Sequence, residues 1–518
     1  MFRSFFLAGF ECATGYNMHG EWIDQIAATE HDLHVDEDYR RLEDVGIRGV
    51  REAIRWPLVD RDGSYDFSSV DPFARAALKH GFDVIWDLFH YGYPSDLDPF
   101  SEQFADRFAA YCKAAARYVV DRMDGRCYFT PINEPSYFAW AAGDVGRFAP
   151  HAHGRAAELK MSLARASIKG IDAIREVCPD ARIVNVDPIC RVAVAANEPD
   201  ALERARRFND EYVFEYWDIV SGRVKPELGG SPRHLDIVGL NYYWTNQWEL
   251  GLEGVPLADD DPRRVPLAEL VRKAWRRYGC EIVITETSAL GDARAPWIHE
   301  LSMMAERLLA EGVPIGGICL YPILGMPEWH ARDEWARMGL WDLQREQNVL
   351  RRTACAPMMA ALQTVHAERG HDIGGRERHL RLPRTGTIPF EVFGRLVWQC
   401  VRPRAHAIRL FRSDRPRRLW VLAITLRAGG KTIEHILTAA ALDRLLVEAA
   451  VDPADLARQH AIENVVFDKH DLKTWRADMS AFVKFAETQQ AANVDEPDRQ
   501  TSEAKESSVR NARKRIRP

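Results

Sequence analysis

Short apolar runs alternate with longer amphipathic segments from the N-terminus to about residue 365. The apolar runs have the length and β-branched content of buried strands, and the amphipathic segments repeat apolar positions at helical spacing. Eight strands are predicted, at residues 5–11, 48–54, 82–89, 127–133, 182–187, 236–242, 281–286 and 315–321. Helices are predicted between them, at residues 37–45, 70–80, 101–122, 155–177, 201–221, 267–278 and 297–311. Eight consecutive βα units predict an α/β protein whose parallel sheet closes into a (β/α)8 TIM barrel.

The chain changes character near residue 366. Residues 366–435 are rich in arginine, and the segment from Arg402 to Arg418 holds seven arginines against one acid. Helical stretches are predicted at about 433–450, 453–465 and 470–488, and residues 488–518 have the polar composition of a disordered tail. We therefore predict a barrel over residues 1–365, a basic, helical appended region of unknown role over 366–487, and a disordered tail over 488–518.

Composition narrows the classes of partner and compartment. The 518 residues are 46% apolar and carry a net charge of −7, which is ordinary for a globular protein and argues against nucleic acid as a partner. No run approaches the length of a membrane span, and the first ten residues are better interpreted as a strand than as a signal peptide. Nine scattered cysteines without paired spacing favour reduced thiols and a cytoplasmic location.

Polar or aromatic residues stand where most of the predicted strands end. In barrels of this type, the C-terminal ends of the strands carry the chemistry. Acids, amides, a histidine and aromatic rings converging on one mouth suit a sugar, which offers hydroxyl groups at its rim and C–H surface on its face. These residues are Asn17, Arg51, His90, Asn133, Glu134, Asn241, Tyr243, Glu286, Glu328 and Trp329.

Two of these acids can form a catalytic pair. Glu134 ends the fourth predicted strand and Glu286 ends the seventh, so the two carboxyl groups are expected on opposite sides of the mouth. Hydrolysis of a glycosidic bond requires such a pair, one acid protonated and the other ionised. A carboxyl separation of about 5–5.5 Å would give retention of configuration. The plain alternative is two unrelated surface acids.

Six motifs in matching order resemble glycoside hydrolase family 1, the family of retaining β-glucosidases and β-galactosidases, over about residues 7–345. They comprise an arginine strand that ends in Trp-Pro, a histidine turn, the acid/base motif, the motif of strand six, the nucleophile motif and the sugar-binding segment of strand eight. Their positions are 51–57, 87–94, 130–135, 236–243, 284–287 and 321–329, the last followed by 339–341.

The resemblance implies a role for each candidate residue in an O-glycosyl hydrolase. Glu134 would be the general acid/base and Glu286 the nucleophile, with Arg51 and Tyr243 holding Glu286 ionised. Asn133 would donate a hydrogen bond to the sugar 2-hydroxyl. The sugar-binding residues would be Asn17, His90, Asn241, Tyr321, Glu328 and Trp329. The resemblance implies neither cofactor nor metal, and the expected partner is a small-molecule glycoside, with no membrane.

Some residues depart from the family pattern. The family usually has Gln at Asn17, Glu at His19, and Trp at both Tyr91 and Tyr321. Glu328 would repel a phosphate, so an unphosphorylated glycoside is expected. Two other functions stay open, a glycan-binding or scaffold barrel without turnover and a transglycosylase. A metal-dependent enzyme is disfavoured, because His151 and His153 form an isolated pair without further ligands.

Overall fold

The computed structural model describes residues 2–123, 127–195, 199–252, 254–346 and 349–368, and three strands between residues 407 and 437. The chain divides into two compact units, Phe2–His379 and a second one formed by Leu380–Pro518. The first unit contains all of the predicted βα units.

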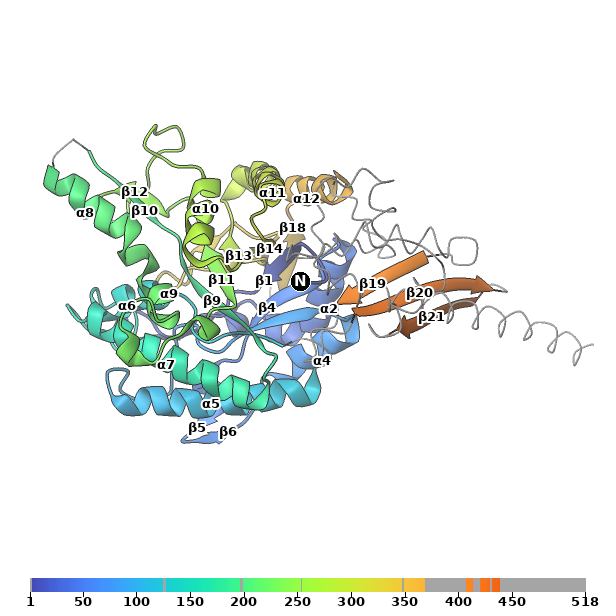
Figure 1. The fold of residues 1–518 in the computed structure, drawn as a ribbon, viewed down its shortest axis with the longest axis horizontal. Helices are drawn as coiled ribbons and strands as arrows, with labels where there is room; N and C mark the ends of the chain where they lie inside the picture. The colour runs from blue at the N-terminus through green and yellow to red at the C-terminus, as the bar shows by residue number, and fades with distance from the viewer. Residues whose placement is uncertain are drawn as a thin grey trace, which may run out of the picture. The chain divides into compact units, whose positions relative to one another are not determined.

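Eight parallel strands close into a barrel, so the predicted (β/α)8 fold is confirmed (Figure 1). Each strand pairs with the next one along the chain, and β14 pairs with β1 to close the ring. All eight lie within the predicted ranges or within one residue of them. In order around the barrel they are β1 (Phe6–Gly9), β4 (Gly49–Ala53), β7 (Asp83–Asp87), β8 (Tyr128–Thr130), β9 (Arg182–Pro188), β11 (Ile237–Asn241), β13 (Glu281–Thr287) and β14 (Ile315–Leu320).

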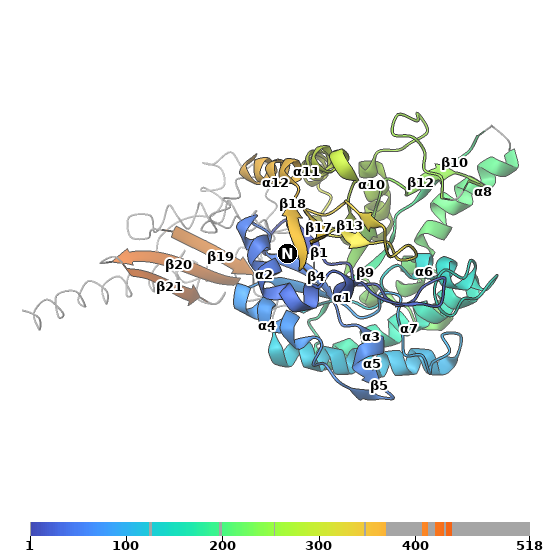
Figure 2. The ribbon, with the colours of Figure 1, turned by 180° about the vertical axis from the view of Figure 1, so that it is seen from behind.

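Helices surround this barrel, and α5 and α7 lie side by side along one flank of it (Figures 1 and 2). Six predicted helices are confirmed, as α2 (His31–Asp44), α4 (Asp71–His80), α5 (Glu102–Arg122), α7 (Ala156–Val177), α10 (Leu267–Tyr278) and α11 (Arg294–Ala310). The single helix predicted at 201–221 is wrong, because the segment is broken into α8 (Pro199–Asp210), η1 (Tyr212–Phe214) and α9 (Glu215–Val220). The helices α6 (Pro135–Gly143) and α12 (Ala356–Glu368) were not predicted.

Short elements decorate the ends of the barrel. The helical ones are α1 (Gln25–Ala28), α3 (Trp56–Val59), η2 (Pro226–Leu228), η3 (Pro232–His234) and η4 (Gly291–Ala293). The strands form two-stranded sheets: β2 (Thr14–Tyr16) with β3 (Trp22–Asp24), β5 (Asp60–Arg61) with β6 (Ser64–Tyr65), β10 (Arg191–Ala193) with β12 (Gln247–Glu249), β15 (Met326–Pro327) with β16 (Trp335–Ala336), and β17 (Trp341–Glu346) with β18 (Val349–Ala354).

The second unit contains an antiparallel sheet of β19 (Ala407–Arg412), β20 (Trp420–Ala428) and β21 (Lys431–Leu437). The helix predicted at 433–450 is therefore wrong at its start, because residues 433–437 pair with β20 as a strand. The rest of that helix, the helices predicted at 453–465 and 470–488, and the tail predicted at 488–518 lie outside the described residues.

Two packed layers follow from the alternation of side chains along each strand. One set points into the barrel and forms an interior cluster that includes Leu7, Ile85, Val283, Cys319 and Tyr321. The other set points outward and joins the larger core beneath the helices. The barrel is thus filled by side chains, and only its mouth is available for chemistry.

Gly9 leaves room for the ring of Tyr321, because a Cβ at this position would lie 1.9 Å from the Cδ2 atom of that ring. We expect Gly9→Ala to lower the free energy of unfolding by about 1–3 kcal/mol, the usual cost of overpacking a core. Chemical denaturation measures this loss. The loss of stability in the double variant Gly9→Ala/Tyr321→Ala should be smaller than the sum of the losses in the two single variants. A loss equal to that sum would contradict the clash.

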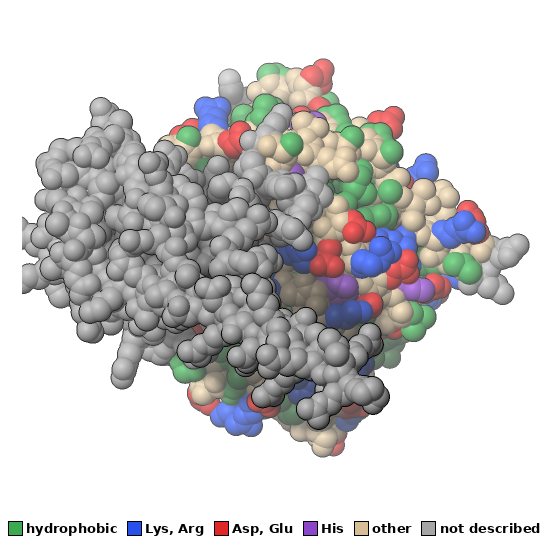
Figure 3. All heavy atoms as spheres, turned by 90° about the vertical axis from the view of Figure 1, so that its right-hand side faces the viewer, with side chains coloured by type: hydrophobic (Ala, Val, Ile, Leu, Met, Phe, Trp, Pro, Cys, Tyr) green, Lys and Arg blue, Asp and Glu red, His purple; other side chains and the backbone are tan. Residues whose placement is uncertain are grey.

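On the described part of the face in Figure 3, acidic and basic side chains are interspersed. Within the described residues, none of the helices combines the length and the apolar character that crossing a membrane requires.

Candidate active site

A bulge in β13 brings Glu286 into the barrel mouth. The pairing of β11 with β13 shifts by one residue between Leu240–Ile284 and Asn241–Glu286. The extra residue is Thr285, whose hydroxyl donates to Asn241 Oδ1 at 2.7 Å, so it also faces inward. Bulges commonly re-aim a side chain beside an active site. Here the bulge lets two consecutive residues serve the same mouth.

Glu134 reaches the mouth through an unusual backbone conformation. It precedes α6, which begins with Pro135, and its φ of +48° lies in the left-handed region. Such a conformation is costly for a residue with a Cβ and is concentrated at functional sites. Tyr91, whose φ is +73°, donates its hydroxyl to Glu134 Oε2 at 2.7 Å. Two strained residues are therefore joined by one hydrogen bond.

Glu286 is held in place by two hydrogen-bond donors. Arg51 Nη1 lies 3.0 Å from its Oε1, and the hydroxyl of Tyr243 donates to its Oε2 at 2.8 Å. The carboxylate is almost fully buried, so these interactions act in a medium of low dielectric constant.

Arg51 is the centre of the polar network. Its guanidinium group binds Asp87 through Nη2 at 2.5 Å, Asn133 Oδ1 at 3.1 Å and the carbonyl of Thr285 at 2.8 Å, in addition to Glu286. Arginine and both acids are buried, so each charge depends on the others for its stabilisation. Asp87 thus supports the site from below, a role that the sequence analysis did not assign to it.

Glu134 lies in the opposite electrostatic environment. Burial and the nearby charge of Glu286 raise its pKa to about 8, against the lowering effect of hydrogen bonds from Tyr91 and Asn241. Asp187 adds to the increase, and it also accepts hydrogen bonds from the backbone and side chain of Ser136 at the start of α6. No ion pair with a lysine or arginine involves Glu134 among the described residues. A carboxyl group with this pKa holds its proton at neutral pH.

Two amides and a histidine connect the acids. Asn241 Nδ2 donates to Glu134 Oε1 at 2.9 Å, and Asn133 Nδ2 lies 3.2 Å from His90 Nε2. Asn133 Oδ1 accepts from Arg51, so the amide of Asn133 connects the arginine to His90. These three predicted residues are therefore brought together with Glu134 and Glu286.

Aromatic rings form the wall of the mouth. Trp329 packs edge-on against Tyr91 with ring centroids 5.6 Å apart, and it also contacts Tyr137 and Phe148. Tyr321 stacks on His90 at 6.1 Å and lies beneath the guanidinium group of Arg51. These rings provide the apolar surface that a sugar ring needs.

Two of the predicted sugar-binding residues lie outside the network around the two acids. The amide of Asn17 closes its own loop, because its Oδ1 accepts from the backbone of His19 and Glu21 while its Nδ2 donates to the carbonyl of Trp329. Glu328 is exposed, and its side chain makes no hydrogen bond within the described chain. Neither side chain joins the hydrogen-bonded network around the two acids.

Three side chains at the mouth could offer ligands to a metal ion. Single ligand atoms of Cys12, Asp87 and His90 all lie within 4.8 Å of one another, and all three residues are buried. However, Asp87 is already neutralised by Arg51, whose positive charge would oppose a bound cation. The cluster instead forms a hydrogen-bonded support, with Cys12 Sγ 3.1 Å from His90 Nδ1.

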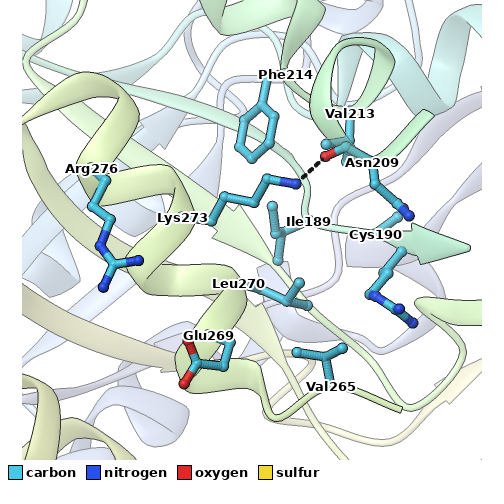
Figure 4. Close-up of a pocket in the computed structure, with 11 residues that line it drawn as sticks. Ile189, Cys190, Asn209, Val213, Phe214, Val265, Glu269, Leu270, Lys273 and Arg276 are labelled. Atoms are coloured by element: carbon cyan, nitrogen blue, oxygen red, sulfur yellow. Dashed lines mark hydrogen bonds between the residues drawn. The ribbon is translucent and has the colours of Figure 1, made fainter. Parts of the chain in front are cut away.

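A separate pocket of about 320 Å³ lies between α10 and the segment that follows β9 (Figure 4). Its lysine, Lys273, is engaged by the carbonyl of Asn209 and by Asp210. None of the residues in the network around the two acids lines this pocket. Cys190 lies on its wall, and burial and the charge of Glu134 raise its pKa.

Similar proteins include glycosidases of several kinds. The chain is 22% identical over 367 residues to β-glucosidase A of Thermotoga maritima, covering 58% of this chain and 79% of that protein. It is 25% identical over 248 residues to a β-glucosidase of Agrobacterium sp., covering 42% and 52%. It is 26% identical over 253 residues to a 6-phospho-β-galactosidase of Lacticaseibacillus casei, covering 40% and 52%. No protein-family model matches the chain.

Solved structures share the barrel. The family 1 β-glucosidase of Thermotoga maritima superimposes with a TM-score of 0.59 at 18% identity, covering 70% of this chain and 97% of that one. Its complex with castanospermine gives a TM-score of 0.57 at 19% identity, covering 71% and 98%. The resemblance to glycoside hydrolase family 1 predicted from the motifs is therefore confirmed.

Proposed function

We propose that this chain, which resembles family 1 β-glucosidases, is a retaining β-glycosidase that removes the terminal sugar of a small unphosphorylated β-glycoside. The observation that carries the proposal is the contrast between two buried carboxyl groups. Glu134 has a pKa raised to about 8 by burial and by Glu286, while Glu286 is held by Arg51 and Tyr243. The reaction requires one acid that holds its proton and a second carboxyl group placed to attack.

In the first step, Glu134 donates its proton to the glycosidic oxygen as Glu286 attacks the anomeric carbon. The bond to the aglycone breaks, and a covalent glycosyl ester forms on Glu286. Arg51 orients Glu286 for the attack, and it stays paired with Asp87 as the charge of Glu286 is consumed. The positive charge therefore remains compensated throughout the step.

In the second step, Glu134 is ionised and removes a proton from water. The water attacks the anomeric carbon from the side that the aglycone left, and the ester bond to Glu286 breaks. Loss of the charge on Glu286 in the intermediate removes one cause of the raised pKa of Glu134. Glu134 is then better able to act as a base, and the two inversions together retain the configuration.

The other residues of the network bind and orient the sugar. Asn133 would donate to the 2-hydroxyl, and His90, Asn241 and Tyr321 would contact the remaining hydroxyls, with Trp329 against the ring face. Although 6-phospho-β-galactosidases are among the similar proteins, the charge of Arg51 at the mouth is already shared by Asp87 and Glu286. Unphosphorylated sugars are thus favoured.

The pH dependence follows from the protonation of Glu134. Because the free enzyme needs Glu134 protonated, kcat/KM for a glycoside with a poor leaving group should fall as the pH rises through about 8. In Tyr91→Phe, Glu134 loses a hydrogen bond that lowers its pKa, so this limb should move to higher pH. Initial rates between pH 5 and 10 measure both. A limb that Tyr91→Phe leaves in place would contradict the assignment.

The test of the proposed function is hydrolysis of a panel of aryl β-glycosides by the intact chain. Turnover that is insensitive to EDTA and yields the β-sugar first supports the proposal, and the α-sugar as first product contradicts it. Transfer to an added alcohol at the expense of water would identify a transglycosylase. Sugar binding with no turnover across the panel would identify a glycan-binding barrel.

We also infer a cytoplasmic location, supported by the free thiols of the eight cysteines that the structure describes.

A further inference from the structure

Glu11 is a carboxylate at the barrel mouth that none of the motifs accounts for. It follows β1 in the same phase as Leu7 and Gly9, which face the barrel interior, so its side chain is directed to the inside of the barrel end. Only 5% of the residue is exposed. Trp329 Nε1 in the wall of the mouth donates to it, and burial together with the charge of Glu286 raises its pKa.

The two oxygens of Glu11 have different surroundings. Oε1 accepts hydrogen bonds from the backbone N–H of Ala13 at 3.0 Å and from Trp329 Nε1 at 3.3 Å. Oε2 accepts none from the described residues, and it is not among the buried polar atoms that are closed off without a partner. One oxygen is therefore fixed by the protein, and the other opens toward the mouth.

No lysine or arginine of the described chain pairs with Glu11. Arg51 is committed to Asp87 and Glu286, and no ion pair of lysine or arginine involves Glu11 within the described residues. Burial raises its pKa and Glu286 raises it further, against the effect of His90. Burying a carboxylate without a lysine or arginine partner is costly, and groups of this kind are concentrated at functional sites.

Glu11 also fills a role that two predicted residues leave open. The amide of Asn17 binds the backbone of His19, Glu21 and Trp329, and Glu328 is exposed. Glu11, on the segment that follows β1, therefore supplies a buried acceptor at the mouth, and Trp329 holds it by a hydrogen bond.

We propose that Glu11 is a specificity-determining residue that accepts hydrogen bonds from the sugar ring bound between Glu134 and Glu286. This inference rests on the proposed function. The group it recognises is a hydrogen-bond donor on the ring, either the hydroxyl of a neutral sugar or the ammonium of an amino sugar. A phosphate or carboxylate at that ring position is repelled. Because Trp329 Nε1 binds the same carboxylate, Glu11 also fixes the ring of Trp329 against the sugar.

The test compares the wild type with Glu11→Gln on nitrophenyl β-glycosides: the parent sugar, the single-deoxy analogues and the corresponding amino-deoxy analogues. Glutamine keeps the size and one acceptor but replaces the open oxygen with an N–H donor. We expect kcat/KM for the parent to fall about 10- to 100-fold, the range for a hydrogen bond to a charged group. The deoxy analogue that lacks the partner hydroxyl should be cleaved equally by both proteins.

The pattern across the panel decides the inference. If the wild type prefers one amino-deoxy analogue and Glu11→Gln loses that preference, the ligand group is an ammonium. If Glu11→Gln instead lowers kcat/KM only for the substrates that carry the partner hydroxyl, the ligand group is a hydroxyl. A loss that is uniform over all analogues, or no loss on any, would overturn the proposal. Glu203→Gln, at an exposed position of α8, is the matched control and should behave like the wild type. Thermal unfolding shows whether the Glu11 variant is folded.

The proposed function and this inference can fail separately. If the wild type cleaves none of these glycosides, the hydrolase proposal fails, and Glu11 is tested by binding of the iminosugar deoxynojirimycin. We then expect Glu11→Gln to weaken this binding at least about tenfold, as measured by calorimetry. Equal affinity for both proteins, or no binding to either, would overturn the role of Glu11.

Discussion

Glu286→Ala is expected to lower kcat/KM for an aryl β-glucoside at least about 10⁴-fold, because removing a nucleophile leaves only binding and electrostatic stabilisation. Arg51 keeps its ion pair with Asp87 in this variant, so the protein should remain folded. Azide can occupy the space of the lost carboxylate and attack the anomeric carbon from the same side. Added azide should therefore restore turnover and give the α-glycosyl azide, detected by NMR.

Two outcomes would contradict this assignment. Wild-type rates in Glu286→Ala would remove Glu286 from the reaction, and a β-glycosyl azide would place the missing group on the wrong face of the sugar. Glu281→Ala, a change to a partly buried acid at the start of the same strand, is the matched control. It breaks an ion pair with Arg182 and should leave turnover near the wild-type level.

Glu134→Ala is expected to show a different pattern that depends on the leaving group. Glycosides with poor leaving groups need the proton, and their kcat/KM should fall about 10²- to 10⁴-fold. Dinitrophenyl glycosides leave without protonation, so formation of the glycosyl enzyme from them should be nearly unaffected. Steady-state rates on a series of aryl glycosides measure the dependence.

Azide should also separate the two acids in this second variant. In Glu134→Ala it attacks the glycosyl ester on Glu286 from the side of the missing acid, so the product should be the β-glycosyl azide. Equal losses on all leaving groups would contradict an acid role for Glu134. Glu134→Gln, which preserves the side-chain volume, separates loss of the proton from loss of packing.

The barrel strands were predictable because their patterns are local. Each is a short apolar run bounded by turn residues, and burial on both faces favours such runs in parallel sheets. The helix α6 was missed because most of its residues, including Phe138, Ala139 and Ala142, are buried, so it lacks a polar face. The strand β21 was mistaken for a helix because its pairing with β20 overrides local propensity.

The candidate site was predictable only in part. Glu134 and Glu286 stand at strand ends, and a position at a strand end is visible in sequence. Glu11 also ends a predicted strand, the first, but none of the six motifs contains it. The behaviour of Asn17 depends on the hydrogen bonds of a loop, which sequence spacing does not encode. The β-bulge at Thr285, which positions Glu286, likewise depends on the register between β11 and β13.

The most direct test of a nucleophilic Glu286 is to trap the intermediate with a 2-deoxy-2-fluoro glycoside that carries a good leaving group. The fluorine slows the second step, so the sugar should remain attached to the protein. Peptide mass spectrometry should find one fluorosugar on the carboxylate of Glu286, with loss of activity that tracks the labelling. A label on any other residue, or an active protein that takes up no label as it turns over, would contradict the account.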